Sequence, residues 1–301
     1  MEVIIASPRG FCAGVVRAIE VVEKSLDTFD SPVYVRKEIV HNPHVVQELR
    51  EKGAIFVDDI KDVPEGQTVV FSAHGVSPDV WRNSENRKLN IMDATCPLVT
   101  KVHAEAIKYA KEGYTILLVG HQGHEEVEGT MGEAPESTIL VEDSEFARSV
   151  QIVDESKVVA LTQTTLSLDD TKDIIGILRE RFPTLVTRND ICYATTNRQI
   201  AVKAMASKVD LVLVIGAQNS SNCNRLREVA SGFGIPAYLI NGPDDISYEW
   251  FADVGKVGIT SGASTPERLV TQVVEKLNPT SIQYLELVDE NVSFVLPKEL
   301  R

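Results

Sequence analysis

Short apolar runs alternate along this chain with stretches that carry a helical period. Residues 3–6 precede a helical stripe at 14–26, and polar loops follow later apolar runs at 68–71, 115–119, 158–161, 210–215 and 257–260. Asn42, Ser77 and Ser167 precede helical stretches and are predicted N-caps. Strands that are apolar on both faces and alternate with helices form parallel sheets covered on both sides. The sequence therefore predicts an α/β fold with mainly parallel sheets.

Three cysteines divide the chain into segments of similar length. Cys12, Cys96 and Cys192 are separated by 84 and 96 residues, and each precedes a helical stretch. No linker rich in Gly, Ser or Pro separates these segments, so we expect them to pack tightly. We predict three similar domains, at 14–96, at 97–192 and at 193–281 together with 1–13, followed by a C-terminal tail at 282–301.

The composition argues against several classes of protein. The first eight residues lack the basic start and apolar core of a signal peptide, and no apolar run approaches the ~20 residues that span a membrane. We therefore expect a cytoplasmic protein. A formal net charge of -14 disfavours binding to nucleic acid or to an anionic membrane. Any phosphate recognised by this chain must be held by a local pocket.

Polar side chains gather in the loops that follow the predicted strands. They are His74, His121, His124, Thr164, Thr165, Ser220, Ser221, Asn222 and Ser264. In open parallel sheets, ligands bind beyond the carboxyl ends of the strands, where helix N-termini favour anions. The natural ligand is a phosphate or diphosphate. Such residues also cap helices without binding anything, but their recurrence in several loops favours a site.

The four cysteines are too few for a disulfide scaffold. Taken singly, each is readily explained as a small buried hydrophobe. Structural zinc sites normally contain a closely spaced cysteine pair, which is absent here, whereas an iron-sulfur cluster accepts dispersed thiolates. If three thiolates converge on a four-iron cluster, one iron remains open to a substrate oxygen. Cys223 also lies near a helix start, so spacing alone does not exclude it as a fourth ligand.

Glutamates follow His124 directly, at positions 125, 126 and 128. A carboxyl group beside a histidine suits a general acid that donates a proton to a substrate. The alternative interpretation is a solvated acidic helix start, because carboxylates favour the first helical turn.

Several motifs together resemble the LytB/IspH family of 4-hydroxy-3-methylbut-2-enyl diphosphate reductases. They lie at 8–14, 40–42, 72–76, 93–99, 120–121 with His124, 126–130, 162–167, 192–199, 219–222 and 262–264. The resemblance implies three α/β domains in a pseudo-threefold arrangement around a [4Fe-4S] cluster. Cys12, Cys96 and Cys192 would hold this cluster and leave one iron open. Cys223 would not be a ligand, because relatives commonly carry serine there.

The resemblance also implies an activity and a donor of electrons. The family reductively removes the hydroxyl group of its substrate to form isopentenyl and dimethylallyl diphosphate, the last step of the non-mevalonate isoprenoid pathway. The substrate hydroxyl would bind at the open iron. Electrons would come from a ferredoxin or flavodoxin, and the chain lacks the Gly-x-Gly-x-x-Gly fingerprint of nicotinamide binding.

By the same resemblance, individual residues acquire roles. Glu126 and Thr164 would act at the reacting end of the substrate, with His124 beside them. The substrate-binding residues would be His41, His74, His124, Thr164, Ser220, Ser221, Asn222 and Ser264. Glu125 departs from the family pattern, which often has proline there; we expect its carboxylate either to increase the proton affinity of Glu126 or to face solvent.

Two other classes of function fit parts of the pattern. A zinc-dependent hydrolase of a phosphorylated metabolite would use Cys and His ligands with a bound water. A non-catalytic iron-sulfur sensor would use the thiols, but has no need of the donor-lined loops or of Glu126.

Overall fold

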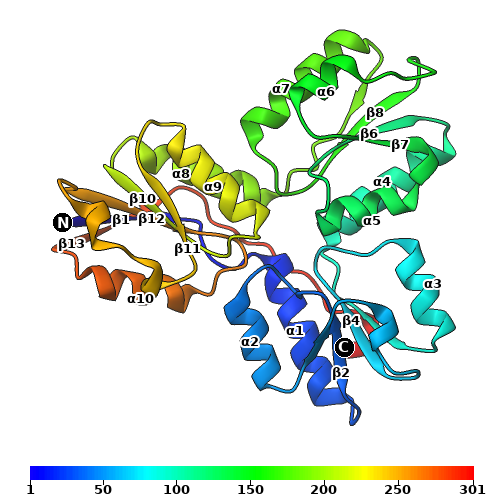
Figure 1. Cartoon of the computed structure of the whole chain (residues 1–301), viewed down its shortest axis with the longest axis horizontal. Helices are drawn as coiled ribbons and strands as arrows, with labels where there is room; N and C mark the ends of the chain where they lie inside the picture. Colours follow the sequence, from blue (N-terminus) through cyan, green and yellow to red (C-terminus); the bar gives the residue numbers. More distant parts are fainter. The chain divides into compact units, whose positions relative to one another are not determined.

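The computed structural model describes residues 1–301 and contains three separate sheets, shown in Figure 1. Every strand pairing within them is parallel. The prediction of an α/β fold with mainly parallel sheets is therefore confirmed. None of the helices is both long enough and apolar enough to span a bilayer.

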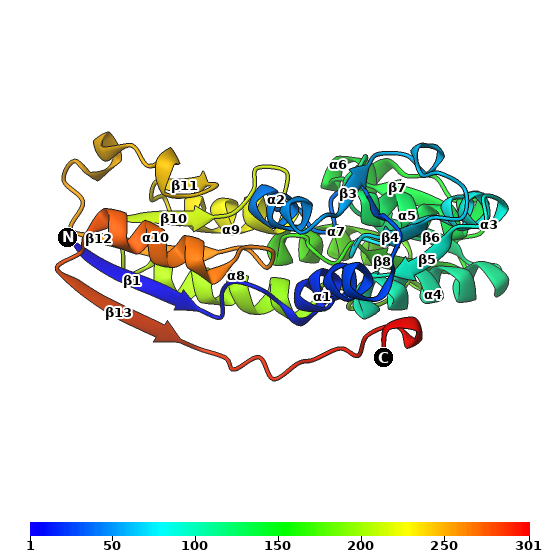
Figure 2. The same cartoon turned by 90° about the horizontal axis from the view of Figure 1, so that it is seen from below.

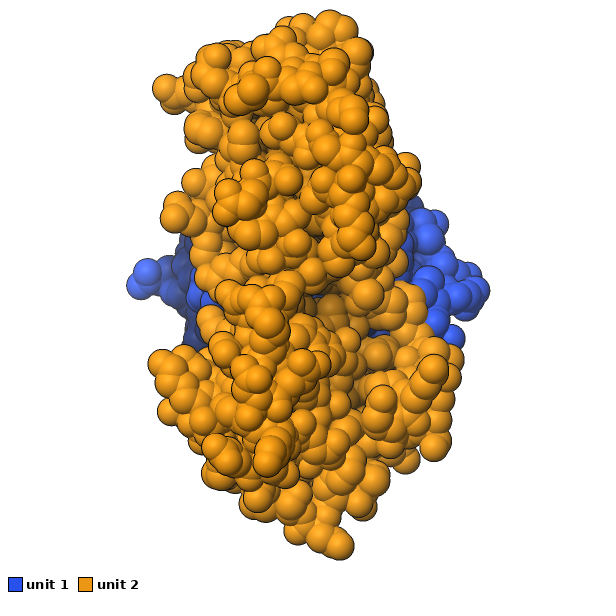
Figure 3. Space-filling model, turned by 90° about the vertical axis from the view of Figure 1, so that its right-hand side faces the viewer, with its two compact units in different colours: residues 1–15, 41–45, 193–293 blue, residues 16–40, 46–192, 294–301 orange.

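The chain forms two compact units, coloured separately in Figure 3. The first unit contains Met1–Val15, His41–Val45 and Tyr193–Ser293. The second contains Val16–Val40, Val46–Cys192 and Phe294–Arg301. Helices α1 (Ala13–Thr28) and α2 (Pro43–Glu51) run from the first unit into the second.

The first unit is built on a five-stranded sheet of order β11-β10-β12-β1-β13. Its strands are β1 (Glu2–Ser7), β10 (Leu211–Ile215), β11 (Ala237–Ile240), β12 (Lys256–Ser261) and β13 (Ser281–Glu286). Its helices are α8 (Tyr193–Ala206), α9 (Ser221–Ser231) and α10 (Glu267–Leu277). Figure 2 shows β13 running beside β1 at the edge of this sheet. Most of β13 thus comes from the segment predicted as a C-terminal tail.

Alternate residues of the central strands pack into two different cores. Leu213 of β10 packs in the core that contains Val270 of α10. Val212, its neighbour in the strand, packs in the opposite core with Met205 of α8 and Leu226 of α9. Burial on both faces explains why this strand reads as a continuous apolar run.

The second unit contains two four-stranded sheets. One has the order β3-β2-β4-β5 and the strands β2 (Val33–Arg36), β3 (Ile55–Val57), β4 (Thr68–Phe71) and β5 (Asn90–Asp93). The other has the order β7-β6-β8-β9 and the strands β6 (Thr115–Val119), β7 (Thr138–Val141), β8 (Val158–Thr162) and β9 (Val186–Thr187). Helices that lie wholly in this unit are α3 (Pro78–Asn86), α4 (Pro97–Lys111), α5 (Glu125–Glu133), α6 (Ser144–Ser149) and α7 (Leu168–Arg181).

All three predicted N-cap positions are confirmed, and two of them carry a side-chain capping hydrogen bond. The Asn42 Oδ1 atom accepts hydrogen bonds from the backbone N–H groups of His44 and Val45, at 3.0 and 3.3 Å. Ser167 Oγ accepts from the backbone N–H of Asp170, which fixes the start of α7. Ser77 is also the N-cap residue of α3, as predicted, but its side chain makes no capping hydrogen bond, and the preset backbone of Pro78 begins the helix.

Candidate functional site

A buried carboxylate and hydroxyl meet at the carboxyl ends of β6 and β8. These strands are neighbours, so the loops that follow them lie side by side. The Thr164 backbone N–H and its Oγ1 hydroxyl both donate hydrogen bonds of 2.9 Å to the carboxylate of Glu126. Glu126 and Thr164 are only 6% and 5% exposed. The structure therefore brings together the two residues predicted to act at the reacting end of a substrate.

His124 defines both the start of α5 and the surroundings of Glu126. Its Nδ1 atom accepts a hydrogen bond of 3.2 Å from the backbone N–H of Glu126, as an N-cap does. An accepting Nδ1 carries no proton, so any proton on this ring is at Nε2. The ring lies edge-to-face with that of His74, with 5.9 Å between the centroids.

Glu125 joins α5 to the loop that follows β4. Its Oε2 atom accepts a hydrogen bond of 3.1 Å from Ser72 Oγ and lies 3.4 Å from His74 Nδ1. The Glu125 side chain is only 11% exposed, so the expectation that it faces solvent is wrong. Burial disfavours the charged form of His74 and so acts to lower its pKa. The contact of His74 with Glu125, together with the nearby carboxylates of Glu126 and Glu38, outweighs burial. The pKa of His74 is therefore raised.

Two of the predicted cluster ligands are attached to these same loops. The backbone N–H of Cys96 donates to the carbonyl of Ala73, beside His74, at 3.0 Å. The backbone N–H of Cys192 donates to the carbonyl of Thr164 at 3.1 Å. Neither cysteine forms a disulfide, and both are half-buried. Within the second unit, the backbone thus connects one cysteine to the His74 loop and another to the Thr164 loop.

The first unit gathers the other predicted residues at the carboxyl end of its own sheet. The backbone N–H of Cys12 donates to the carbonyl of Ala263 at 3.1 Å, beside Ser264. Ser264 Oγ donates to the carbonyl of His41 at 3.0 Å. Cys12, His41 and Ser264 therefore occupy one neighbourhood, although more than 200 residues separate Ser264 from His41 in sequence (|i−j| = 223).

The first turn of α9 carries the remaining predicted donors. Ser220 is the N-cap, and its Oγ accepts from the backbone N–H of Cys223 at 3.4 Å. Ser221 and Asn222 consequently lie inside the helix and not in the preceding loop where we expected them. The Asn222 side chain is 5% exposed, yet neither its amide oxygen nor its amide nitrogen has a hydrogen-bond partner. Buried amides without a protein partner are rare, so this amide is available to a polar ligand or to water.

Comparison with known proteins identifies the family to which this arrangement belongs. A family model described as LytB protein matches residues 3–278. The chain belongs to the LytB family. The resemblance read from the motifs is thereby confirmed.

Similar LytB-family proteins cover the whole of this chain. The 4-hydroxy-3-methylbut-2-enyl diphosphate reductase of Ralstonia nicotianae is 50% identical over 100% of this chain and 94% of its own length. A protein of Mycobacterium bovis, 4-hydroxy-3-methylbut-2-enyl diphosphate reductase 2, is 53% identical with the same coverage. The solved structure of the E-1-hydroxy-2-methyl-but-2-enyl-4-diphosphate reductase from Plasmodium falciparum has a TM-score of 0.96 and 41% identity, and covers 100% of this chain and 96% of that chain.

The fourth cysteine of this LytB family member differs from the other three. Cys223 is fully buried, whereas Cys12, Cys96 and Cys192 are half-buried. A Cβ atom built on Gly216 or Gly262 would lie 2.2 or 2.1 Å from Cys223 Sγ, so the thiol fills the space that these two glycines leave. Burial also raises the pKa of this thiol, which opposes formation of the thiolate that a metal needs.

His103 of α4 is a supporting residue that the sequence reading missed. It is 8% exposed, and its Nδ1 lies 2.9 Å from Glu133 Oε1. Cβ atoms on Gly75 and Gly129 would lie 3.3 and 3.0 Å from its Cε1. The ring is therefore wedged between the loop that carries His74 and the helix that carries Glu126. Gly75, which follows His74, and Gly129, which lies in the motif at 126–130, are the only features of the sequence that hint at a bulky side chain packed here.

Arg198 is a second missed residue and supports the Cys12 loop in the first unit. Its side chain is fully buried, and Nη2 donates to the carbonyl of Gly10 at 2.8 Å. Nη1 donates to Glu290 at 3.0 Å, which compensates the buried charge. Nothing in the spacing of the motif at 192–199 distinguishes this role from that of its neighbours.

Proposed function

We propose that this chain reduces 4-hydroxy-3-methylbut-2-enyl diphosphate to isopentenyl and dimethylallyl diphosphate, as an iron-sulfur oxidoreductase of isoprenoid synthesis. Relatives that cover the whole chain at 50% and 53% identity are named for the reduction of this diphosphate. The observation that carries the proposal is the buried Glu126 carboxylate, which Thr164 holds in the unit that also contains Cys96 and Cys192. A proton donor next to thiols suits a reaction in which a hydroxyl group leaves as water.

The thiols fit a [4Fe-4S] cluster. Cys12, Cys96 and Cys192 form no disulfide, are partly accessible and are fixed by backbone hydrogen bonds at helix starts, where the helix dipole favours the thiolate. We assign these three as the ligands and exclude Cys223, which is sealed in the core. When bound with three thiolates, such a cluster would supply electrons and, at its open iron, a Lewis acid for the substrate hydroxyl.

The polar side chains of the first unit suit the diphosphate. Ser220, Ser221 and Asn222 stand at the start of α9, where unbonded backbone N–H groups and the helix dipole favour an anion. The unbonded Asn222 amide offers two N–H donors to phosphate oxygens. We assign His41 and Ser264 to the same group, together with His74 and His124 of the second unit.

The proton needed for loss of water is held at Glu126. Thr164 orients both carboxylate oxygens of Glu126 and offers its own hydroxyl as the next position for the proton. His124 contributes its Nε2–H for a substrate oxygen, because its Nδ1 is occupied as an acceptor. Water is excluded from the Glu126–Thr164 contact by burial, which strengthens its hydrogen bonds.

Two further parts of the function concern the cell. The absence of a disulfide among the four cysteines favours a reducing compartment, and we assign the protein to the cytoplasm. A small ferredoxin or flavodoxin would deliver the electrons, since the chain has no nicotinamide fingerprint of its own.

Metal analysis and an activity assay test this function together. Anaerobically purified protein should be brown, contain about four irons and four sulfides per chain, and reduce the diphosphate with reduced methyl viologen. Cys96→Ser should lose the cluster, while Cys223→Ser should keep the wild-type iron content. A colourless zinc protein would disprove the cluster, a brown protein without turnover would leave only a sensor, and loss of iron in Cys223→Ser would reject the three-thiol assignment.

A further inference from the structure

A cavity in the second unit includes neither Glu126 nor Thr164 in its wall, although Thr162, at the end of β8, is part of that wall. It has a volume of about 310 Å³ and lies between α7 and the segment that leads from β9 to Cys192. Leu168, Ile175 and Ile191 form apolar parts of its wall. None of the residues assigned above to substrate or cluster lines it.

Three exposed cations surround this cavity in a protein of net charge -14. Lys172 and Arg179 are seven residues apart, so they lie on one face of α7, and Arg188 stands on the opposite wall. The acidic residues of the same helix, such as Asp173 and Glu180, do not line the cavity. The part of α7 that lines the cavity therefore carries Lys172 and Arg179 and no carboxylate, although Asp169 lies one turn from Lys172.

The single carboxylate in the wall is already neutralised. The side chain of Asp190 is fully buried; its Oδ1 lies 3.1 Å from Lys101 Nζ and its Oδ2 accepts from the backbone N–H of Thr162 at 3.3 Å. Arg188 donates two hydrogen bonds, of 2.8 and 3.1 Å, to Glu105. Lys101 and Glu105 both belong to α4, so these contacts attach the wall of the cavity to that helix.

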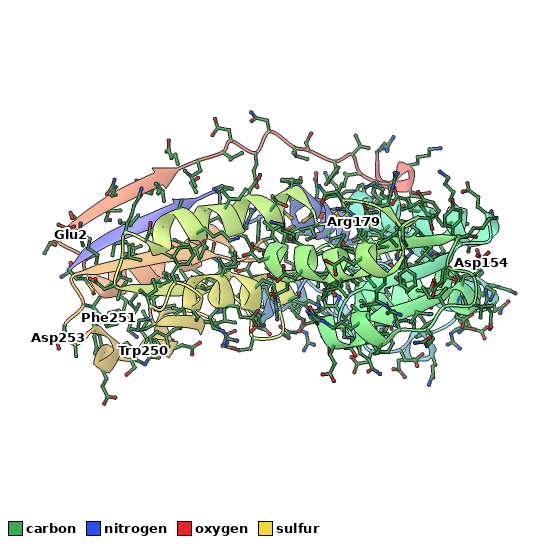
Figure 4. All side chains as sticks on the ribbon, turned by 90° about the horizontal axis from the view of Figure 1, so that it is seen from above. Glu2, Asp154, Arg179, Trp250, Phe251 and Asp253 are labelled. Carbon is green, nitrogen blue, oxygen red and sulfur yellow. The ribbon has the colours of Figure 1, made fainter.

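The outer cations keep capacity for a ligand. Arg179, labelled in Figure 4, uses Nη2 to donate to Thr187 Oγ1 at 2.8 Å. A guanidinium has five N–H donors, so others remain. Lys172 is exposed and adds a mobile ammonium group. The combination of an apolar floor and a positive rim suits a protein surface that presents carboxylates around an apolar patch.

The position of the cavity relates it to electron transfer. Asp190 and Ile191 line it, and the next residue is Cys192, one of the three thiols assigned to the cluster. A protein seated on this cavity would touch the segment that carries a cluster ligand. Most of the remaining surface of so acidic a chain repels an acidic partner, so a local positive site both guides the partner and fixes its orientation.

We propose that this cavity, with Lys172 and Arg179 at its rim, is the docking site for the acidic face of the electron-donor protein. The proposal rests on the function proposed above. The donor is defined here by its chemistry, as a small redox protein that presents carboxylates close to its own redox centre.

Charge reversal of the rim separates docking from chemistry. The variant is Lys172→Glu/Arg179→Glu, and the control Lys24→Glu/Lys111→Glu makes the same change in net charge at exposed positions of α1 and α4. Each holoenzyme is titrated with an acidic [2Fe-2S] ferredoxin and with an acidic flavodoxin by calorimetry at low salt. Turnover is then measured with the reduced donor protein and, separately, with reduced methyl viologen.

We expect the rim variant to bind the donor at least about tenfold more weakly and to raise its apparent KM by a similar factor. Turnover driven by viologen, which needs no docking, should stay at the wild-type value. The salt dependence of donor binding should become shallower, while Lys172→Arg/Arg179→Lys and the control should bind within about twofold of wild type.

Several results would overturn the proposal. These are equal donor binding by wild type and rim variant, an equal loss in the control, or binding of neither donor protein by the wild type. Saturable binding of inorganic phosphate that the rim variant abolishes, without donor binding, would make the cavity a small-anion site instead. Failure of wild-type turnover with viologen would reject the proposed function and is seen independently of donor binding.

Discussion

The polar clusters of the two units differ in how completely their side chains are bonded. Around Glu126, every carboxylate oxygen has a partner, and Thr164 supplies both a backbone and a side-chain donor. In α9, the Asn222 amide is equally buried and has no partner at either atom. A group that transfers a proton gains from a fixed position before substrate arrives, whereas an unbonded amide gains its partner only from the ligand. The cluster around Glu126 and Thr164 is preorganised, whereas the cluster at the start of α9 is completed by the ligand that binds there.

Replacement of Glu126 tests the preorganised cluster most severely. Glu126→Gln preserves the shape and can still accept from Thr164, but it removes the acid, so we expect viologen-driven kcat to fall by about 10²- to 10⁴-fold. The matched control Glu128→Gln changes an exposed carboxylate of the same helical turn and should leave kcat within about twofold. Cluster absorbance should be unchanged in both. Full turnover by Glu126→Gln with an intact cluster would remove Glu126 from the chemistry.

The unbonded amide predicts a different response. Asn222→Ala should raise KM for the diphosphate by about 10- to 100-fold, because hydrogen bonds to charged groups contribute about 1.5–3 kcal/mol. Loss of the amide breaks no hydrogen bond in the ligand-free protein. Thr164→Ala, in contrast, removes a donor from a buried carboxylate and should lower both kcat and thermal stability. Equal stability losses in the two variants would contradict the contrast between the clusters.

A smaller effect, on the free energy of unfolding, is expected from replacing Gly129, which packs against His103 near Glu126. A Cβ on Gly129 would lie 3.0 Å from the His103 ring, so Gly129→Ala should destabilise the protein by about 1–3 kcal/mol. Gly176 is a matched control, since it also lies inside a helix but has open space around its Cβ position. Gly176→Ala should stabilise the protein by about 0.5–1 kcal/mol. Urea unfolding measures both, and a second replacement, His103→Ser, should relieve the strain in Gly129→Ala.

The sequence predicts the central strands well but misses several edge strands. All five residues of β10 are buried, so the strand appears as an unbroken apolar run. The strands β7, β9 and β11, which the sequence does not predict, all lie at sheet edges, whereas the edge strand β3 is predicted as an apolar run at 54–57. The two residues of β9 are too few to show the alternation that marks a strand.

The same distinction holds for the site. His124 and Thr164 follow predicted strands in polar loops, and the family resemblance distinguishes Glu126 from the two neighbouring glutamates; the structure places these three residues together. The contact of Glu125 with Ser72 and His74 depends on how two sheets of the second unit pack, which neither spacing nor motif encodes. For the same reason, the packing of the His103 ring between the His74 loop and α5 is established only by the structure.

The smallest expected effect concerns the pH dependence of the His74–Glu125 contact. Glu125, Glu126 and Glu38 raise the His74 pKa above its usual 6.5 against the opposing effect of burial, and the neighbouring ring is His124. A raised pKa means that the folded protein holds the proton more tightly than the unfolded chain. The resulting stabilisation is complete below about pH 6.5 and is lost as pH rises through the higher folded value.

Glu125→Gln should therefore lower the melting temperature more at pH 6 than at pH 9. Ser72→Ala, which removes the neutral partner of the same carboxylate, serves as control and should show a loss that depends less on pH. A larger loss for Glu125→Gln at pH 9 would show that the carboxylate stabilises this loop through Ser72 alone, and that the bonding around the preorganised cluster does not depend on a charged His74.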